Sequence, residues 1–355
     1  MKFLDRNAPG VEWSQDSPDT VSMAPPGQST DVYPTACPAC GGELGVDGYC
    51  LVCGQKAKNL REHYETAPQP WLAGVCDIGA LHTRNEDAMA CQADQTRAVI
   101  VVCDGVTTSD GSDVASLAAA RTACDLLWAD DPQGVGTASS RTAAVNAVLT
   151  QAVTTANQAV IDATSEDSRN SAATTIAIAV TDDKAIHCAN LGDSRVYWLP
   201  DAAAPCQITK DHSLAQDGID SGTGRAEAES SIFAHTITKW LGRDATDVTP
   251  YLAVVERDGP GWLLVCSDGL WNYASEAAAV AALVGQFTAA DPTPSHLASA
   301  LVAWANDQGG HDNITVVCAR LTAPGAAAAD TAAAQGTTPL STDPEAGERP
   351  TVRLG

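Results

Sequence analysis

Aspartates stand at the ends of three apolar segments of this sequence. Asp104 follows VIVVC, Asp268 follows LLVCS, and Asp312 precedes NITVV. One aspartate at such a position is usually a turn or capping residue, but the pair Glu86–Asp87 in TRNEDA adds two further carboxyl groups. Clustered carboxylates repel one another unless cations neutralise them, and all-oxygen ligands favour hard cations such as Mg²⁺ or Mn²⁺. The pattern therefore indicates a site for divalent cations.

A second candidate metal site lies near the N-terminus. The segment CPACGGELGVDGYCLVCG contains two CxxC pairs, each followed by glycine: Cys37, Cys40, Cys50 and Cys53. Four thiolates on two tight turns suit one closed, structural Zn²⁺ site, and two closely spaced pairs fit a metal better than a redox couple. The other eight cysteines lie mostly in apolar runs, which is typical of small buried side chains in a reducing compartment.

The elements that would position the carboxylates change type along the chain. Short apolar runs predict strands, and the segment 174–199 predicts three strands joined by the turns TDDK and LGDS. Stretches that begin at Asp113, at Thr142 and at about Ser295 predict helices. Strand hairpins mixed with paired helices, without strict βα alternation, indicate a layered α+β fold.

Composition divides the chain into five parts. Residues 1–34 and 323–355 lack hydrophobic periodicity and are predicted to be disordered tails, the second of them rich in Ala, Thr and Pro. The cysteine unit, interpreted as a small zinc ribbon, occupies 35–56. A mostly polar linker spans 57–70, and the main domain spans 71–322. The linker is long enough for the ribbon to move independently.

Bulk composition excludes several classes of function. A formal charge of −24 over 355 residues repels nucleic acid, so we expect no nucleic-acid partner. Hydrophobic residues make up 45% of the chain, enough for a sizeable core. No apolar run approaches the roughly 18 residues of a membrane span, and the N-terminal sequence lacks the apolar core of a secretory signal. We therefore expect a cytoplasmic protein, not bound to a membrane and monomeric.

Six short segments, taken together, resemble the type 2C, metal-dependent protein phosphatases, and most closely their bacterial members. In chain order they are HTRNEDA, CDGV, ANLGDSRVY, ITKDHSL, SDGLW and GGHDNITVV. The match covers about Gly74 to Leu321. The resemblance implies an α-β-β-α sandwich, in which two antiparallel sheets pack face to face between helical hairpins. It also implies hydrolysis of phosphoserine and phosphothreonine in proteins.

The resemblance further implies which residues hold the catalytic metals. Asp104 would bridge two cations, Mn²⁺ or Mg²⁺. Asp268 and Asp312 would complete one site, and Glu86 with the backbone carbonyl of Gly105 would complete the other. The two cations would share a water molecule, lower its pKa and generate the hydroxide that attacks phosphorus.

Other positions have supporting roles in the same scheme. Asp87 would support the metal shell and Asn313 would orient Asp312. A third cation could use Asp268, with Asp167 as the nearest further acidic candidate.

The phosphate-binding residue departs from the family pattern. Many relatives have arginine five residues before the aspartate of NED, where this chain has His82. Arg84 could take that role and His82 could share it. A guanidinium group binds phosphate through two hydrogen bonds, whereas imidazole does not.

The middle of the match is interpreted as structural. In ANLGDSRVYWL, Asp193 would make local hydrogen bonds and Arg195 a buried ion pair. In ITKDHSL, Asp211 and His212 would cap the next segment. The segment 217–234 has the position of the family's mobile flap.

Three functions remain open from the sequence. The first is a phosphatase of phosphorylated proteins, with a Ser/Thr protein kinase and its substrates among the candidate partners. The second is a catalytically weak, phosphatase-like adaptor. The third is a phosphatase of a small phosphorylated regulator, such as a sigma-factor control protein. The presence of all the implied carboxylates favours an active enzyme over an adaptor.

Overall fold

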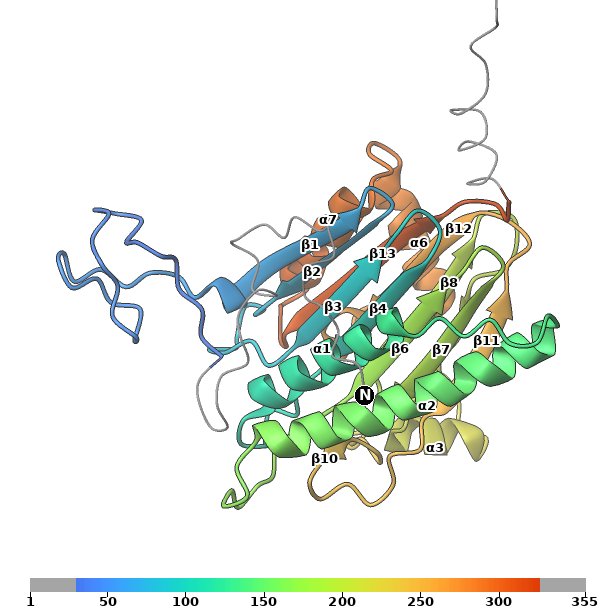
Figure 1. The fold of residues 1–355 in the computed structure, drawn as a ribbon, viewed down its shortest axis with the longest axis horizontal. Helices are drawn as coiled ribbons and strands as arrows, with labels where there is room; N and C mark the ends of the chain where they lie inside the picture. The colour runs from blue at the N-terminus through green and yellow to red at the C-terminus, as the bar shows by residue number, and fades with distance from the viewer. Residues whose placement is uncertain (1–29, 326–355) are drawn as a thin grey trace, which may run out of the picture.

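Two antiparallel sheets lie face to face at the centre of the structure (Figure 1), a computed structural model that describes residues 30–325. The first sheet has the order β1-β2-β13-β12-β8-β9. Its strands are β1 (His63–Gln69), β2 (Leu72–Asp77), β13 (Ile314–Leu321), β12 (Gly261–Cys266), β8 (Arg195–Pro200) and β9 (Cys206–Gln207). The second sheet has the order β11-β7-β6-β4-β3. Its strands are β11 (Tyr251–Glu256), β7 (Ala185–Leu191), β6 (Ile176–Thr181), β4 (Ala98–Cys103) and β3 (Ala88–Ala93).

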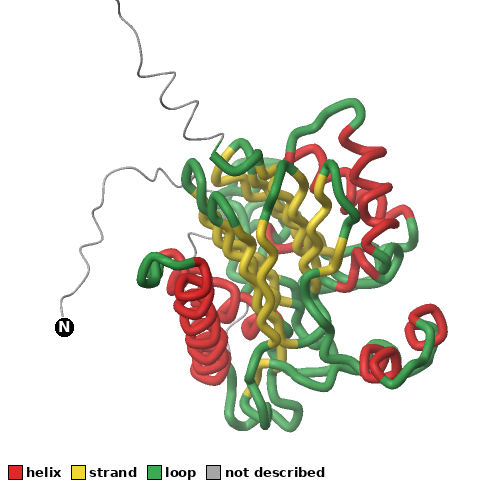
Figure 2. The backbone as a smooth tube through the Cα atoms, turned by 90° about the vertical axis from the view of Figure 1, so that its right-hand side faces the viewer, coloured by secondary structure: helices red, strands yellow, loops and turns green. Residues whose placement is uncertain are grey.

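Helices cover the outer face of each sheet (Figure 2), so the predicted α-β-β-α sandwich is confirmed. The pair α1 (Ser112–Ala129) and α2 (Ala138–Ala163) packs on the second sheet. The pair α6 (Ala277–Thr288) and α7 (Pro294–Asp307) packs on the first sheet. The remaining short elements are η2 (Leu60–Glu62), α3 (Leu214–Asp220), α4 (Arg225–Glu229), α5 (Asp268–Trp271) and the β5 (Ala173–Thr174)–β10 (Leu241–Gly242) ladder.

The apolar runs of the sequence follow from this layering, because each central strand is covered on both faces. In β4, Ile100 and Val102 face the other sheet, while Val99 and Val101 face α1 and α2. The strand therefore contains no charged or strongly polar side chain, and Asp104 is the first such residue after its end at Cys103. Among the described residues, no helix is both long and apolar enough to cross a bilayer.

The predicted linker over residues 57–70 is wrong. Residues 63–69 form β1, which pairs with β2 from His63 opposite Asp77 to Gln69 opposite Leu72. β1 is an edge strand in which only Tyr64 is fully buried, so its sequence lacks the apolar signal of the central strands. Ala57 and Arg61 are also buried. The segment is therefore part of the main domain, while most of both predicted tails lies outside the described residues.

The cysteine unit consists of two similar turns. The amide of Gly41 donates to the carbonyl of Cys37, and that of Gly54 donates to the carbonyl of Cys50. Both glycines have positive φ, 72° and 74°, which explains why glycine follows each CxxC pair. The four cysteine sulfur atoms lie within 4.8 Å of one another. Hydrogen bonds from backbone amides, first that of Cys53, lower the pKa of Cys50 to about 6 and so favour the thiolate that a metal binds.

Candidate active site

Antiparallel pairing brings the predicted carboxylates to one end of the sandwich. β4 ends at Cys103, opposite Ala88 at the start of β3, so Asp104 and the pair Glu86–Asp87 share one edge of the second sheet. β12 ends where β13 begins, with Cys266 opposite Val316, so Asp268 and Asp312 share one edge of the first sheet.

Hydrogen bonds join these two edges. Ser267 and Thr315, from the first sheet, both donate their hydroxyl groups to Oδ2 of Asp87, each at 2.7 Å. The amide of Glu86 donates to Oδ1 of Asn313 at 2.7 Å. The three acidic residues at one edge and the two at the other therefore form one site that spans both sheets.

Asn313 and Ser112 hold Glu86 in place. Nδ2 of Asn313 donates to the carbonyl oxygens of Ile78, at 2.8 Å, and Arg84, at 3.1 Å. The hydroxyl of Ser112, the first residue of α1, donates to Oε1 of Glu86 at 2.6 Å. Asn313 therefore ties the start of β13 to the loop that carries Glu86, beyond the predicted contact with Asp312, to which its backbone amide donates.

Gly105 is required by a close approach of three backbone segments. A Cβ atom at this position would lie 2.6 Å from the carbonyl oxygen of Glu86 and 2.7 Å from that of Ser112. Neither backbone oxygen can move aside as a flexible side chain could. Only glycine therefore lets residue 105 lie beside Glu86, where its carbonyl was predicted to bind a metal.

Burial and mutual repulsion favour the protonated carboxyl groups. Burial, then the charges of Asp87 and Asp268, hold the pKa of Asp104 well above its usual range. Burial raises the pKa of Asp87 to about 8 and that of Asp312 to about 6, with the Asp268 charge contributing to both. Nearby cations would reverse this penalty.

The donor set fits hard divalent cations. Oδ1 of Asp87 and Oδ1 of Asp268 are buried without a hydrogen-bond partner. Such orphaned acceptors are rare in folded proteins and a cation would satisfy them. Within residues 30–325, no three carboxyl groups place one oxygen each within 4.8 Å of one another, unlike the four cysteine sulfurs.

The two predicted phosphate-binding residues lie differently. Nε2 of His82 is 3.3 Å from Oδ1 of Asp312, at the carboxylate cluster. Arg84 is half-exposed, and its Nη1 lies 3.0 Å from Oδ1 of Asp113 in the first turn of α1.

Asp193 is the acidic residue whose place the sequence interpretation missed. It is buried in the turn from β7, in the second sheet, to β8, in the first. Burial, then the charge of Asp268, raises its pKa well above the usual range, and Asp193 in turn contributes to the raised pKa of Asp104. Asp167, the predicted candidate for a third metal, is instead exposed in a turn. The composition of this turn is ordinary, so the place of Asp193 follows only from the crossing of the turn from one sheet to the other.

Arg195 forms the predicted buried ion pair. Its Nη2 lies 2.6 Å from Oδ2 of Asp211 and 3.3 Å from Oε1 of Glu229. Asp211 is therefore an ion-pair partner and not the predicted cap, because Ser213 caps α3. The predicted flap over 217–234 contains the end of α3 and all of α4.

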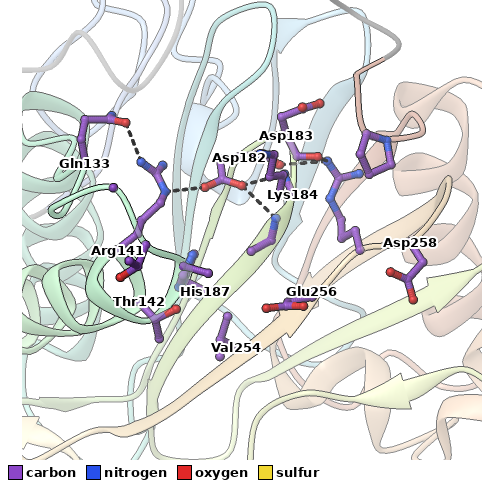
Figure 3. Close-up of a pocket in the computed structure, with 16 residues that line it drawn as sticks. Gln133, Arg141, Thr142, Asp182, Asp183, Lys184, His187, Val254, Glu256 and Asp258 are labelled. Atoms are coloured by element: carbon purple, nitrogen blue, oxygen red, sulfur yellow. Dashed lines mark hydrogen bonds and ion pairs between the residues drawn. The ribbon is translucent and has the colours of Figure 1, made fainter.

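The structure also has a cavity of about 740 Å³ (Figure 3), and none of these carboxylates lines it. It is lined by the turn Asp182–Lys184, by Arg141 from α2 and by His187 from β7, among others. This turn follows Thr181, which pairs with Ala98 at the start of β4, whereas Asp104 follows the end of β4. The cavity is therefore at the opposite end of the second sheet and is not part of the carboxylate site.

A sandwich of this type with buried carboxylates at one end defines a candidate metal-dependent hydrolase. The family model described as Protein phosphatase 2C matches residues 81–306. This chain belongs to the protein phosphatase 2C family.

Individual relatives agree with this assignment. The chain is 29% identical over 245 residues to the serine/threonine phosphatase stp of Listeria innocua, over 68% of this chain and 92% of the relative. The S. agalactiae serine/threonine phosphatase structure superposes with a TM-score of 0.59 at 24% identity, over 72% of this chain and 98% of that one. The Mycobacterium tuberculosis serine/threonine phosphatase PstP/Ppp gives a TM-score of 0.54 at 28% identity, over 71% and 98%.

Proposed function

We propose that this protein hydrolyses phosphoserine and phosphothreonine in other proteins, with two Mn²⁺ or Mg²⁺ ions as cofactors. Family membership and the relatives' names support the substrate class. The observation that carries the proposal is the pair of buried, unpartnered oxygens on Asp87 and Asp268, beside an aspartate whose pKa is strongly raised.

The residues would divide the work as follows. Asp104, Asp268 and Asp312 would hold one cation, and Glu86 with the carbonyl of Gly105 would complete the other site. Asp87 is fixed by Ser267 and Thr315 and would support the shell. When bound, two such cations supply a hydroxide nucleophile and offset charge on the phosphoryl oxygens. Water then cleaves the phosphoester, leaving a free hydroxyl side chain and inorganic phosphate.

Arg84 and His82 are the proposed phosphate-binding residues. Arg84 is half-exposed, so its guanidinium group can leave the ion pair with Asp113 and bind phosphate instead. It also keeps its charge at every working pH. His82 already lies beside Asp312 and would share this role. If a third cation binds near Asp268, Asp193 is better placed to hold it than Asp167, because Asp193 is buried and affected by the Asp268 charge.

We also propose one structural Zn²⁺ on Cys37, Cys40, Cys50 and Cys53, whose sulfur atoms are close enough to share one ion. All 12 cysteines lie within the described residues and none forms a disulfide, which favours a reducing cytoplasm. Phosphorylated proteins are the proposed partners, including a Ser/Thr protein kinase and its substrates, and a monomer is the proposed state.

Metal removal and reconstitution test the proposal. The full chain, stripped with a chelator, should lose hydrolysis of an aryl phosphate and of phosphoserine and phosphothreonine peptides, and Mn²⁺ should restore it. Asp268→Asn should lower turnover by at least about 100-fold, the upper end of what even outer-shell changes cost. Asp258→Asn, an exposed change at the cavity end, is the matched control.

Two results would reject the proposal. Full activity of the metal-free protein would rule out the two-metal site. Tight Mn²⁺ binding without hydrolysis of any phosphopeptide would instead favour the phosphatase-like adaptor.

A further inference from the structure

A buried arginine lies directly behind the loop that carries Glu86 and Asp87. Arg61, in η2, is 2% exposed. Its Nη2 donates to the carbonyl oxygen of Asp87 at 3.0 Å and to that of Asn85 at 3.5 Å. Nδ2 of Asn85 donates back to the carbonyl oxygen of Arg61 at 2.9 Å. The two accepting carbonyls belong to the residues on either side of Glu86, so the guanidinium group bridges the peptide group before Glu86 and the one after Asp87.

The positive charge of Arg61 is buried next to the carboxylate site. In the described part of the chain, no carboxylate lies within ion-pair distance of it, and its Nε and Nη1 atoms are buried without partners. Burying an unpaired cation is costly. The cation sits instead behind the cluster of carboxylates, donates hydrogen bonds only to the backbone that carries two of them, and lies 5.6 Å from the ring centre of Tyr64. Its contacts therefore favour one arrangement of that loop.

The segments on either side of the cysteine unit hold Arg61 in place. Oδ1 of Asn59 accepts hydrogen bonds from the amides of Val32, at 2.9 Å, and Arg61, at 3.0 Å. The amide of Leu60 donates to the carbonyl of Val32 at 2.6 Å. We call these paired segments, residues 30–34 and 57–62, the stem; the cysteine unit projects from it, away from the sheets (Figure 1).

We infer that Arg61 is a positioning residue that holds the loop Asn85–Asp87 in its metal-binding arrangement. The inference rests on the proposed function, because that function makes Glu86 and Asp87 part of the metal site. Without the guanidinium group, the carbonyls on both sides of Glu86 lose their shared donor and Glu86 can leave the position that Ser112 and Asn313 select. Metal affinity should then fall, as it does when outer-shell partners of metal ligands are removed.

The test compares two buried arginines. Arg257 is 7% exposed, and its guanidinium group donates to the carbonyls of Thr322, Asp182 and Asp183. Its Nε also lacks a partner, but it lies at the cavity end of the fold. Mn²⁺ affinity is measured by calorimetry on the zinc-loaded full chain for wild type, Arg61→Met, Arg61→Lys and Arg257→Met. Unfolding temperatures in chelator are measured in parallel.

Arg61→Met should raise the Mn²⁺ Kd by about 10-fold or more, and Arg61→Lys should lie between it and wild type. Arg257→Met should lower the unfolding temperature in chelator yet leave the Kd unchanged. The loss of turnover in Arg61→Met should be largest at sub-saturating Mn²⁺ and should shrink at saturation.

Equal Mn²⁺ affinity in Arg61→Met and Arg257→Met would overturn the inference and leave Arg61 a purely structural residue. If Arg61→Met does not fold, Arg61→Lys and Asn59→Ala test the inference in its place. Both variants should weaken Mn²⁺ binding. Unchanged Mn²⁺ binding in both would overturn the inference. A wild-type protein that neither binds Mn²⁺ nor hydrolyses phosphopeptides would reject the proposed function instead.

Discussion

Asp87 combines strong local support with a high electrostatic cost. Its Oδ2 accepts two hydroxyl hydrogen bonds, which favour the charged form, whereas its Oδ1 has no partner. Burial and the charges of Asp312 and Asp268 outweigh the hydroxyl groups and raise its pKa to about 8. In the absence of metal, the folded protein therefore favours a proton on this site.

This predicts a pH-dependent effect of Asp87→Asn on metal-free stability. The pKa is about 3.9 in an unfolded chain and about 8 in the fold. The stabilisation from this group is therefore fully present below about pH 3.9 and is lost as pH rises through about 8. Asparagine carries no charge, so the Tm of the variant minus that of wild type should increase between about pH 5 and about pH 8 in chelator.

The effect should amount to several degrees, since about 1 kcal/mol shifts Tm by roughly 2–4 °C at this domain size. Thermal unfolding at the two pH values measures it, and taking the difference cancels the titrating groups that do not interact with Asp87. With saturating Mn²⁺ the order should reverse, because only wild type keeps the full shell. A difference in Tm that is constant with pH would contradict the prediction.

At the scale of elements, Arg195 joins parts that are far apart in the sequence. It begins β8, pairs with Asp211 before α3 and with Glu229 at the end of α4, and its guanidinium carbon lies 3.6 Å from the ring centre of Trp271 in α5. The end of α4 is anchored at this point, whereas Ile232 and Phe233, which follow it, are 91% and 59% exposed.

Removal of this ion pair should destabilise the fold strongly. Arg195→Met should cost about 3–5 kcal/mol, because it leaves Asp211 buried without its cation. The double variant Arg195→Met/Asp211→Leu should recover part of the loss, since it removes both charges. Urea unfolding of the two variants and wild type measures this, and a loss below about 1 kcal/mol in the single variant, typical of an exposed pair, would show that the pair contributes little.

Elements with a continuous run of apolar residues could be predicted from the sequence. Elements and residues whose place depends on contacts with distant parts of the chain could not. β4, β12 and β13 are buried on both faces, so their runs and terminal aspartates are visible in the sequence. β1 buries only Tyr64 fully, so its sequence has the pattern of a polar linker. Asp193 stands in a turn of ordinary composition and joins the site only because β7 and β8 belong to different sheets. Arg61 carries no motif, since its role depends on contacts with Asn85 and Asp87.

At the scale of the whole molecule, the ribbon and the stem should be separable. The two segments of the stem are hydrogen-bonded to each other between Val32 and Leu60. Residues 35–56 can therefore be replaced by a short glycine linker without separating these segments. This variant should lose zinc and keep the wild-type Mn²⁺ affinity. Deletion of residues 1–62 removes Arg61 as well and should raise the Mn²⁺ Kd by about 10-fold.

Metal analysis and calorimetry on these two proteins check the prediction. The same Kd in both would mean that the stem adds nothing to the active site. A higher Mn²⁺ Kd in the linker variant, with β1 still folded, would mean that the zinc-bound ribbon itself supports the stem.

The place of β13 in the first sheet also governs when this protein can become active during its synthesis. β13 is the last described strand along the chain, yet it lies between β2 and β12, and Asp312 lies two residues before its start. While the ribosome has not yet released residues 312–321, β2 and β12 lack their common neighbour and the carboxylate cluster lacks a member. A growing chain therefore carries no complete site, and catalytic competence arrives only with the final strand.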